Sequence, residues 1–492
     1  MKKILYTMIL ACSTMMVSCD SWLEVKPYDK ISEGELQKSE EGYQKMLNGI
    51  YIDLNSDALY GQSLSVEMIE VMGGAYAIGT DNSVWGNYKD LSNYQYGTEY
   101  WRNRLDQTWN KAYALILNCN KILESIDQNQ DLFTGGNYYA VKGEALALRA
   151  MLHFDMLRLF GPVYAKDSEK KAIPYYNKQT NSPEPILTAK EVAEKVVADL
   201  EEARILLAND PVKTEGTLMS GSQDGTSNFM RYRALRLNFY AVEALLARVN
   251  LYMGNKTEAF KYATDVIKTA DQDIFPFVDK SLVIGSPADP DRIFSSEVLF
   301  ALTNTSRSKI HKNFYDPSRL PNYVFRMDDN LMSNIVYGGA ATTGGYQDDY
   351  RYRANWIATG SNRYFYKYSD MVANGSIQNT MIPMIRLGEM FLIAAESQSD
   401  DLAKGVQYVN ALRRNRGVAN LQTLTPDLLK YEYIRELYGE GQLFYLYKRL
   451  NSDIITSSNA NKNPKASDLI FVVPLPDLSL IHISEPTRHL RI

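Results

Sequence analysis

The sequence contains little cysteine and little histidine, with three and four residues among 492. Cys12 lies in an N-terminal apolar run and Cys19 follows that run, so Cys119 is the single thiol expected to remain free in the mature protein. One thiol excludes a disulfide framework and a metal site built from several cysteines. No two histidines stand at helical spacing, so we expect neither a metal site nor a cofactor.

An excess of positive charge is also absent. The formal net charge is −5, and loss of residues 1–18 would remove Lys2 and Lys3, which leaves 58 acidic side chains against 51 basic ones. Because binding to nucleic acid depends on positive charge, we expect no nucleic-acid partner.

Motifs of the common enzyme classes are missing as well. The chain has no phosphate-binding loop, no dinucleotide fingerprint and no nucleophile elbow. Carboxylate pairs could serve a glycoside hydrolase or lyase, but a chain with 58 acidic residues offers many pairs by chance. We therefore predict a protein that is not an enzyme and name no catalytic residue, with a hydrolase or lyase as the less favoured alternative.

The N-terminus has the composition of a secretory signal peptide, residues 1–18. Two lysines precede an apolar run from Ile4 through Cys12, and small residues follow it. The run is too short to span a bilayer, and nothing after Cys19 looks transmembrane. Met16-Val17-Ser18-Cys19 looks like a lipobox, which predicts acylation of Cys19; cleavage without lipid is the alternative.

The strongest helical signal lies between Arg233 and Ala270. Apolar residues recur there at steps of three and four, beside a second stripe of alanines, so both faces of this helix can pack. The pattern stops at Gly254-Asn255 and resumes at Ala259, which predicts a helical hairpin. Its small residues have the spacing of a tetratricopeptide hairpin, so we predict a mostly α fold with a tetratricopeptide-like scaffold.

Helical periods recur along much of the remaining chain. They predict helices over 40–54, from Trp109, over 139–160 and over 188–208, the last with a capping box at Thr188 and Glu191. They also predict a second hairpin over 384–418 and one helical run from Thr425. His153 lies among core positions, so we expect a buried histidine rather than a catalytic base. Arg435, Glu436 and Glu440 are expected to form buried or half-buried ion pairs.

Two long segments, about 55–100 and 271–380, lack a helical period and are rich in glycine and aromatic residues. Ordered loops of this length are often functional, and an exposed aromatic ring can cover the apolar face of a sugar while amides bind its hydroxyls. The candidate ligand-binding residues are Trp85, Asn87, Tyr88, Tyr94, Tyr323 and Trp356. Alternatively, these rings pack the loops onto the scaffold, as we expect of Trp101 and Trp109.

Several motifs carry a resemblance to a known family. ALLARVNLYMG, ALRAMLHFDMLRLFGPV and IRLGEMFLIAAE resemble the SusD/RagB family of surface nutrient-binding lipoproteins. The family more often has His-Arg and Trp-Asp where this chain has Gln442-Leu443 and Tyr445-Leu446.

The resemblance implies a lipoprotein held at the cell surface on the outer membrane. It would bind an extracellular glycan or oligosaccharide and deliver it to a SusC-like TonB-dependent transporter. Peptide or glycoprotein capture by the same scaffold is the alternative.

The resemblance also suggests the organisation of the chain. A single SusD-like domain would cover 19–477, with the helical scaffold in about 39–270 and 381–451 and the irregular, ligand-facing segments in about 55–100 and 271–380. LSLIHISEPTR, which follows Asp477, looks like a translated sequencing adapter. Residues 478–492 are therefore interpreted as a non-native tail.

Overall fold

The structure is a computed structural model that describes residues 33–81, 85–180, 182–222, 227–285, 289–318, 324–338, 346, 348–360, 362–370, 376–398, 401–462 and 464–476. Residues 1–18, predicted to be a signal peptide, lie outside these described residues, as do Cys19, Tyr323 and residues 478–492.

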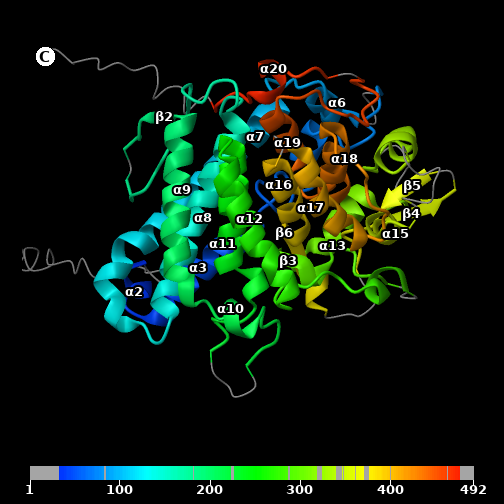
Figure 1. Ribbon diagram of the computed structural model, residues 1–492. Helices are drawn as coiled ribbons and strands as arrows, with labels where there is room; N and C mark the ends of the chain where they lie inside the picture. The colour runs from blue at the N-terminus through cyan, green and yellow to red at the C-terminus, as the bar shows by residue number, and fades with distance from the viewer. Residues whose placement is uncertain are drawn as a thin grey trace, which may run out of the picture.

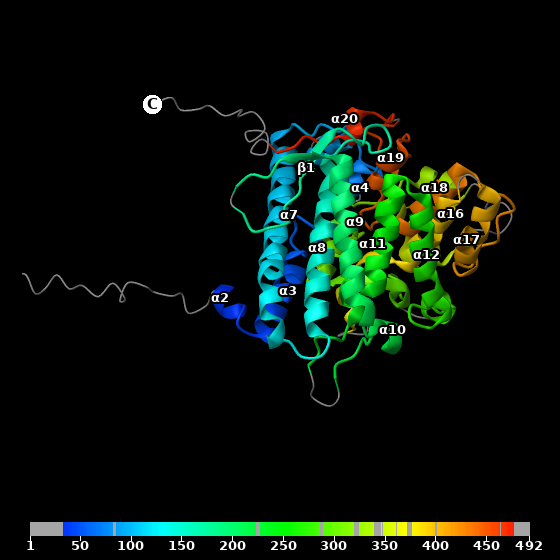
Figure 2. The same cartoon turned by 60° about the vertical axis from the view of Figure 1, so that its left-hand side comes forward.

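Helices placed side by side form most of the molecule. The long ones are α3 (Glu40–Asp53), α7 (Glu99–Ile126), α8 (Asn137–Phe160), α9 (Ala189–Leu206), α11 (Phe239–Met253) and α12 (Lys256–Asp271), followed by α16 (Leu387–Ser397), α17 (Leu402–Arg414), α18 (Pro426–Leu437) and α19 (Leu443–Leu450). Figure 2 shows α7, α8, α9, α11, α12, α16 and α17 in succession, and consecutive members of this series pack together. The predicted mostly α, hairpin-built fold is confirmed.

The hairpin of α11 and α12 lies at the centre of this series. Gly254 ends α11 with φ +82°, a conformation that favours glycine, and α12 begins two residues later. The alanines of the second stripe are fully buried, so α11 does pack on two faces. The helix begins at Phe239 rather than near Arg233, because Arg233 sits in a short 3₁₀ turn and Asn238 caps the helix by accepting from the Ala241 N–H.

Two other helix boundaries differ from the prediction. Helix α7 begins at Glu99, ten residues before Trp109, because Trp101 is fully buried and continues the packed face of the helix. The run from Thr425 is two helices rather than one, since Gly439 and Gly441 adopt φ of +74° and +73° between them.

The capping box at the start of α9 is confirmed. The Glu191 N–H donates to the Thr188 side chain, and the Thr188 N–H donates to the Glu191 carboxylate. These two bonds satisfy donors that a helix start otherwise leaves without partners.

Among the described residues, three antiparallel strand pairs join segments of the chain. They are β1 (Lys171–Pro174) with β2 (Ile186–Thr188), β3 (Val298–Thr303) with β6 (Met381–Arg386), and β4 (Trp356–Thr359) with β5 (Asn362–Phe365). The β4–β5 hairpin lies at the edge of the molecule in Figure 1. The alternating sequence from Arg363 begins within β5.

The segments without helical period contain short elements only. They include α4 (Met68–Met72), α6 (Asn87–Ser92), α13 (Arg307–Ile310), α14 (Asp329–Leu331) and α15 (Tyr350–Asn355); α2 (Glu33–Leu36), α10 (Val212–Glu215) and α20 (Asp468–Phe471) are short helices elsewhere. The side chain of Asp349 caps α15, and its carboxylate also pairs with Arg351 at 2.7 Å. Tyr350 therefore begins a helix.

A buried cluster of charges joins α18 to the rest of the fold. Glu436 lies 2.7 Å from Arg386, 2.8 Å from Arg416 and 3.1 Å from Arg351. Arg435 pairs with Glu432 at 3.0 Å, and Arg386 pairs with Glu440 at 2.7 Å. The ion pairs expected of Arg435, Glu436 and Glu440 are confirmed and are buried.

Candidate functional site

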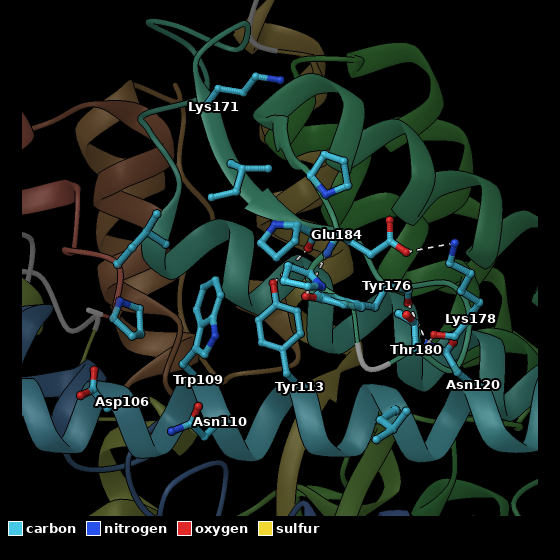
Figure 3. Close-up of a pocket in the computed structure, with 17 residues that line it drawn as sticks. Asp106, Trp109, Asn110, Tyr113, Asn120, Lys171, Tyr176, Lys178, Thr180 and Glu184 are labelled. Carbon is cyan, nitrogen blue, oxygen red and sulfur yellow. Dashed lines mark hydrogen bonds and ion pairs between the residues drawn. The ribbon is translucent and has the colours of Figure 1, made fainter. Parts of the chain in front are cut away.

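A cavity of about 710 Å³ opens between α7, the segment from β1 to β2, and Leu475-Pro476 near the end of the described chain. Figure 3 shows α7 along its floor, with β1 and the following loop above it. This volume falls in the range that is typical of small-molecule sites.

Three aromatic rings form one wall of the cavity. Trp109 and Tyr113 are four residues apart on α7, so they share a helix face, and their ring centroids are 4.5 Å apart. Tyr176 comes from the loop after β1, and its ring lies 5.6 Å from that of Tyr113. Figure 3 shows Trp109 and Tyr113 pointing from α7 toward β1. The rings are inclined to one another, by 42° for Trp109 and Tyr113 and by 75° for Tyr113 and Tyr176, and they give the cavity an apolar wall against which a sugar ring can pack.

Polar side chains surround these rings. Lys178 and Glu184 form an ion pair of 3.2 Å across the loop between β1 and β2. The amide of Asn110 is exposed, and Asp106 lies one helical turn before it. The cavity therefore combines an apolar wall with hydrogen-bonding groups at its edge, which is the combination that binds sugar hydroxyls.

A buried network fixes the loop that carries Tyr176. The amide of Asn120 donates to the backbone oxygens of Tyr176 (3.1 Å) and Lys178 (3.0 Å), while its oxygen accepts from Arg149 at 2.9 Å. Arg149 is held in turn by both carboxylate oxygens of Asp199, each at 2.7 Å. The loop is thus tied to α7 and α8 before any ligand arrives, which reduces the entropy lost on binding.

His153 takes part in the same network. The Tyr176 N–H donates to His153 Nε2 at 3.1 Å, so Nδ1 carries the proton and donates to the Arg149 carbonyl at 2.9 Å. Burial lowers the pKa of His153 to about 3, so the ring is neutral at physiological pH. The expectation of a buried, hydrogen-bonded histidine is confirmed, and its role is to position the loop.

Three of the aromatic residues predicted to bind a ligand, Trp85, Tyr88 and Trp356, lie elsewhere, in a buried group of rings. Trp85 stacks parallel to Phe325 at 6.4 Å, and Tyr88 meets Phe325 edge-on at 5.1 Å. Trp356 packs against Tyr438 at 5.0 Å. Contacts through Tyr76 connect Tyr438 to Phe325, so Trp85, Tyr88 and Trp356 belong to one cluster.

Little of this cluster is exposed. Trp85 retains 8% of its surface and Trp356 6%, while the Tyr88 hydroxyl donates to Glu67 at 2.7 Å. Asn87 is exposed at the start of α6. Tyr94 lies apart, and its hydroxyl donates to the Met72 carbonyl. The packing accounts for these rings without a ligand, and their role in binding stays a prediction.

The wall residues Trp109, Tyr113 and Tyr176 were not among the residues predicted to bind. Trp109 is 7% exposed, as a core residue should be, yet its ring borders the cavity. The spacing of Trp109 and Tyr113 could have indicated a shared face. The loop that covers this face comes from sequence some 60 residues away, so no local pattern indicated the cavity.

Few residues of the cavity could catalyse a reaction. Its carboxylates, Asp106 and Glu184, stand on opposite sides of the aromatic wall in Figure 3. Among the described residues, no group of three or more histidine, cysteine, aspartate or glutamate side chains is placed to hold a metal ion. None of the described helices has the length and apolar character needed to cross a membrane.

Cys119 lies on α7 and is fully buried. Burial raises the pKa of its thiol to about 12, so the thiolate is scarce at neutral pH. The thiol is therefore a core residue rather than a nucleophile.

Comparisons with known proteins agree with one another. A family model described as "Starch-binding associating with outer membrane" matches residues 21–222. A SusD-like protein of Formosa agariphila is 24% identical, over 86% of this chain and 84% of the relative. A solved SusD superfamily protein from Bacteroides thetaiotaomicron superposes with a TM-score of 0.69 at 21% identity, covering 90% of this chain and 98% of the other.

A second solved structure, a SusD-like carbohydrate binding protein from Bacteroides vulgatus, has a TM-score of 0.67 at 17% identity. The superposition covers 92% of this chain and 98% of that one. At these identities the structural matches establish a shared fold.

Proposed function

We propose that this chain is a member of the SusD/RagB family and a cell-surface lipoprotein that binds an extracellular glycan and passes it to a SusC-like TonB-dependent transporter. The family is described as starch-binding and associated with the outer membrane. Binding and delivery proceed without making or breaking a bond. Anchoring beside a transporter raises the effective concentration of captured glycan at its entrance.

The observation that supports glycan binding best is the aromatic wall of the cavity. Trp109, Tyr113 and Tyr176 line the cavity, and Asn110, Lys178 and Glu184 place hydrogen-bonding groups within the same space. Peptide capture is the second candidate, because the Lys178–Glu184 pair could also meet charged peptide groups.

Affinity electrophoresis against a panel of polysaccharides tests this function. The protein would begin after Cys19 and end at Asp477, and we expect at least one glycan to retard it. Tyr176→Ala should weaken that binding about 10- to 100-fold, because the wall loses a ring that excludes water from the contact. Tyr139→Ala, which removes an exposed tyrosine of α8, is the matched control and should bind like the wild type.

Two further variants distinguish binding in the cavity from binding at Trp85 and Trp356, which were predicted from the sequence. If Trp85→Ala and Trp356→Ala abolish retardation while Tyr176→Ala does not, the glycan binds near Trp85 and Trp356 rather than in the cavity. Absence of retardation by every glycan would contradict glycan capture and favour the peptide alternative. Release of shortened sugars during incubation would instead indicate hydrolysis.

The lipid anchor is tested by replacing Cys19 with alanine in cells. The wild-type protein should sediment with membranes and be released by detergent, because acyl chains on Cys19 would hold it there. Cys19→Ala should move to the soluble fraction, whereas Cys119→Ala, which changes a buried thiol, should stay with the membranes. Equal membrane retention of both variants would contradict the anchor.

A further inference from the structure

Buried arginines in this protein are usually neutralised by carboxylates. Arg233 lies 2.9 Å from Glu144 and 2.6 Å from Asp210, and all three side chains are fully buried. Arg416 lies 2.5 Å from Glu297 and 2.8 Å from Glu436. This pairing is expected, because an isolated charge in the protein interior costs several kcal/mol.

Arg292 and Arg307 depart from this pattern. Arg292 is 8% exposed and Arg307 is 2% exposed. Two nitrogen atoms of Arg292, Nε and Nη1, are buried without a hydrogen-bond partner, and so is Nε of Arg307. Arg307 donates only to backbone carbonyls, those of Ser369 at 3.1 Å and Met381 at 3.4 Å. Within the described part of the chain, neither guanidinium forms an ion pair with a carboxylate.

Both arginines belong to one small region together with His311. The Arg292 guanidinium lies 5.8 Å from the centre of the Tyr366 ring, and the His311 ring lies 5.0 Å from it. The carbonyl that Arg307 binds belongs to Ser369, whose N–H donates to Tyr366 at 2.9 Å. His311 Nε2 is also buried without a partner. Four buried nitrogen atoms of these three side chains therefore lack a hydrogen-bond partner in the same region.

Nearby carboxylates do not supply the missing acceptors. Asp291 accepts from the N–H and the hydroxyl of Ser295, at 2.8 and 2.6 Å. Asp316 accepts from the Ser318 N–H, and Asp370 is exposed. Asp289, Asp291 and Asp370 therefore attract the arginines only through space.

Deprotonation does not remove the charge either. Burial lowers the pKa of Arg307 to about 10, so its guanidinium remains charged at neutral pH. Burial also lowers the pKa of Arg292. Two buried positive charges with unused donors need negative charge and acceptor lone pairs from outside the described chain.

We propose that Arg292, Arg307 and His311 form a buried site for one small inorganic anion, such as a halide. The anion would accept from Arg292 Nε and Nη1, Arg307 Nε and His311 Nε2, the four nitrogen atoms without partners. It would stabilise the irregular part of the fold between α13 and the β4–β5 hairpin, on the right of Figure 1. This site is independent of glycan binding.

Bromide provides a direct probe, because it scatters anomalously and can replace chloride. Crystals of the unchanged protein soaked in sodium bromide should show an anomalous peak within about 3.5 Å of Arg292 and Arg307 nitrogen atoms. A map with bromide peaks on the surface but none at this position would overturn the proposal. This measurement needs no variant, so it holds even if substitutions here prevent folding.

Thermal unfolding distinguishes specific binding from binding at crystal concentrations only. The Tm of the wild type should rise with bromide concentration relative to sodium MES of equal ionic strength, because a ligand of the folded state stabilises it. Arg292→Gln should remove this difference. Arg353→Gln, which changes a side chain that is 51% exposed, should retain it. A wild type without the difference, or Arg292→Gln with all of it, would contradict the proposal.

Discussion

Replacing Glu436 with glutamine is expected to lower the free energy of unfolding by about 3–5 kcal/mol, the usual cost of breaking a buried ion pair from one side. Its carboxylate contacts Arg386, Arg416 and Arg351, and all four side chains are buried. Glutamine has nearly the same shape but no charge, so these arginines would lose a shared counter-charge. Urea denaturation followed by circular dichroism would measure the loss.

Glu258→Gln is the matched control for this prediction. Glu258 pairs with Lys261 at 3.0 Å on the surface of α12, and its side chain is 47% exposed. Exposed pairs contribute about 0–1 kcal/mol, so this variant should unfold almost like the wild type. Equal losses in the two variants would mean that the buried cluster contributes no more than an exposed pair.

The free energy of unfolding should fall steeply at acidic pH, and the pKa of Glu432 indicates the pH range in which it falls. Burial alone would raise its pKa, but attraction to Arg435, Arg351 and Arg413 outweighs burial and lowers the pKa to about 2. The ordinary value is 4.5. The stabilisation from ionised Glu432 is therefore complete above about pH 4.5 and is lost as the pH falls toward 2. By linkage this loss amounts to about 3 kcal/mol.

Glu70 should act in the opposite direction at higher pH. Burial raises its pKa to about 8, although N–H groups of Gly441 and Gly439 donate to it. A carboxyl group that stays protonated in the folded state favours folding at low pH. Its contribution is therefore lost as the pH rises from about 4.5 to 8. The two groups together predict greatest stability near pH 5.

Urea denaturation at intervals between pH 2.5 and 8 would measure both effects. Glu432→Gln should unfold more easily at pH 5 but lose less stability on going to pH 3 than the wild type. Glu70→Gln should flatten the decline between pH 5 and 8. A wild type equally stable at pH 3 and pH 5 would contradict the role assigned to Glu432.

The scaffold could be predicted from sequence because its signals are local. The periodic stripe of α11, the break at Gly254 and the capping box at Thr188 each lie within a few residues of one another, and the structure has all three. The predicted helix boundaries were less accurate where contacts between residues distant in the sequence determine them. Trp101 is buried in the first turns of α7, and its indole N–H donates to the carbonyl of Asn87, a contact that no helical period reveals.

The candidate site was less predictable because it is assembled from distant segments. Trp85 and Trp356 were predicted to bind a ligand because their segments are rich in aromatic residues, yet both rings pack against other aromatic residues. The cavity depends instead on a loop that Asn120 and His153 hold over α7. Whether a ring faces a ligand or the core depends on what lies opposite it, and the sequence around the ring does not contain that information.

The departure from the usual family pattern near residue 442 has a structural counterpart. Arg158 donates to the side chain of Gln442 at 2.9 Å, and its guanidinium lies 3.9 Å from the centre of the Tyr445 ring. Gln442 and Tyr445, one residue from each departing pair, therefore contact the same arginine. An amide acceptor and an aromatic face together stabilise a buried guanidinium, so the two changes are best understood as a matched pair.

The pairing of β3 with β6 has a consequence for how this protein can diversify. Thr303 and Met381 are partners in that ladder, so the two ends of a segment of nearly 80 residues leave the scaffold at neighbouring points. The separation of these ends does not depend on the length of chain between them, and lengthening a loop between fixed ends costs little free energy. Insertions and deletions in this segment can therefore accumulate over evolution without moving the helices, which lets relatives with the same scaffold acquire different surfaces.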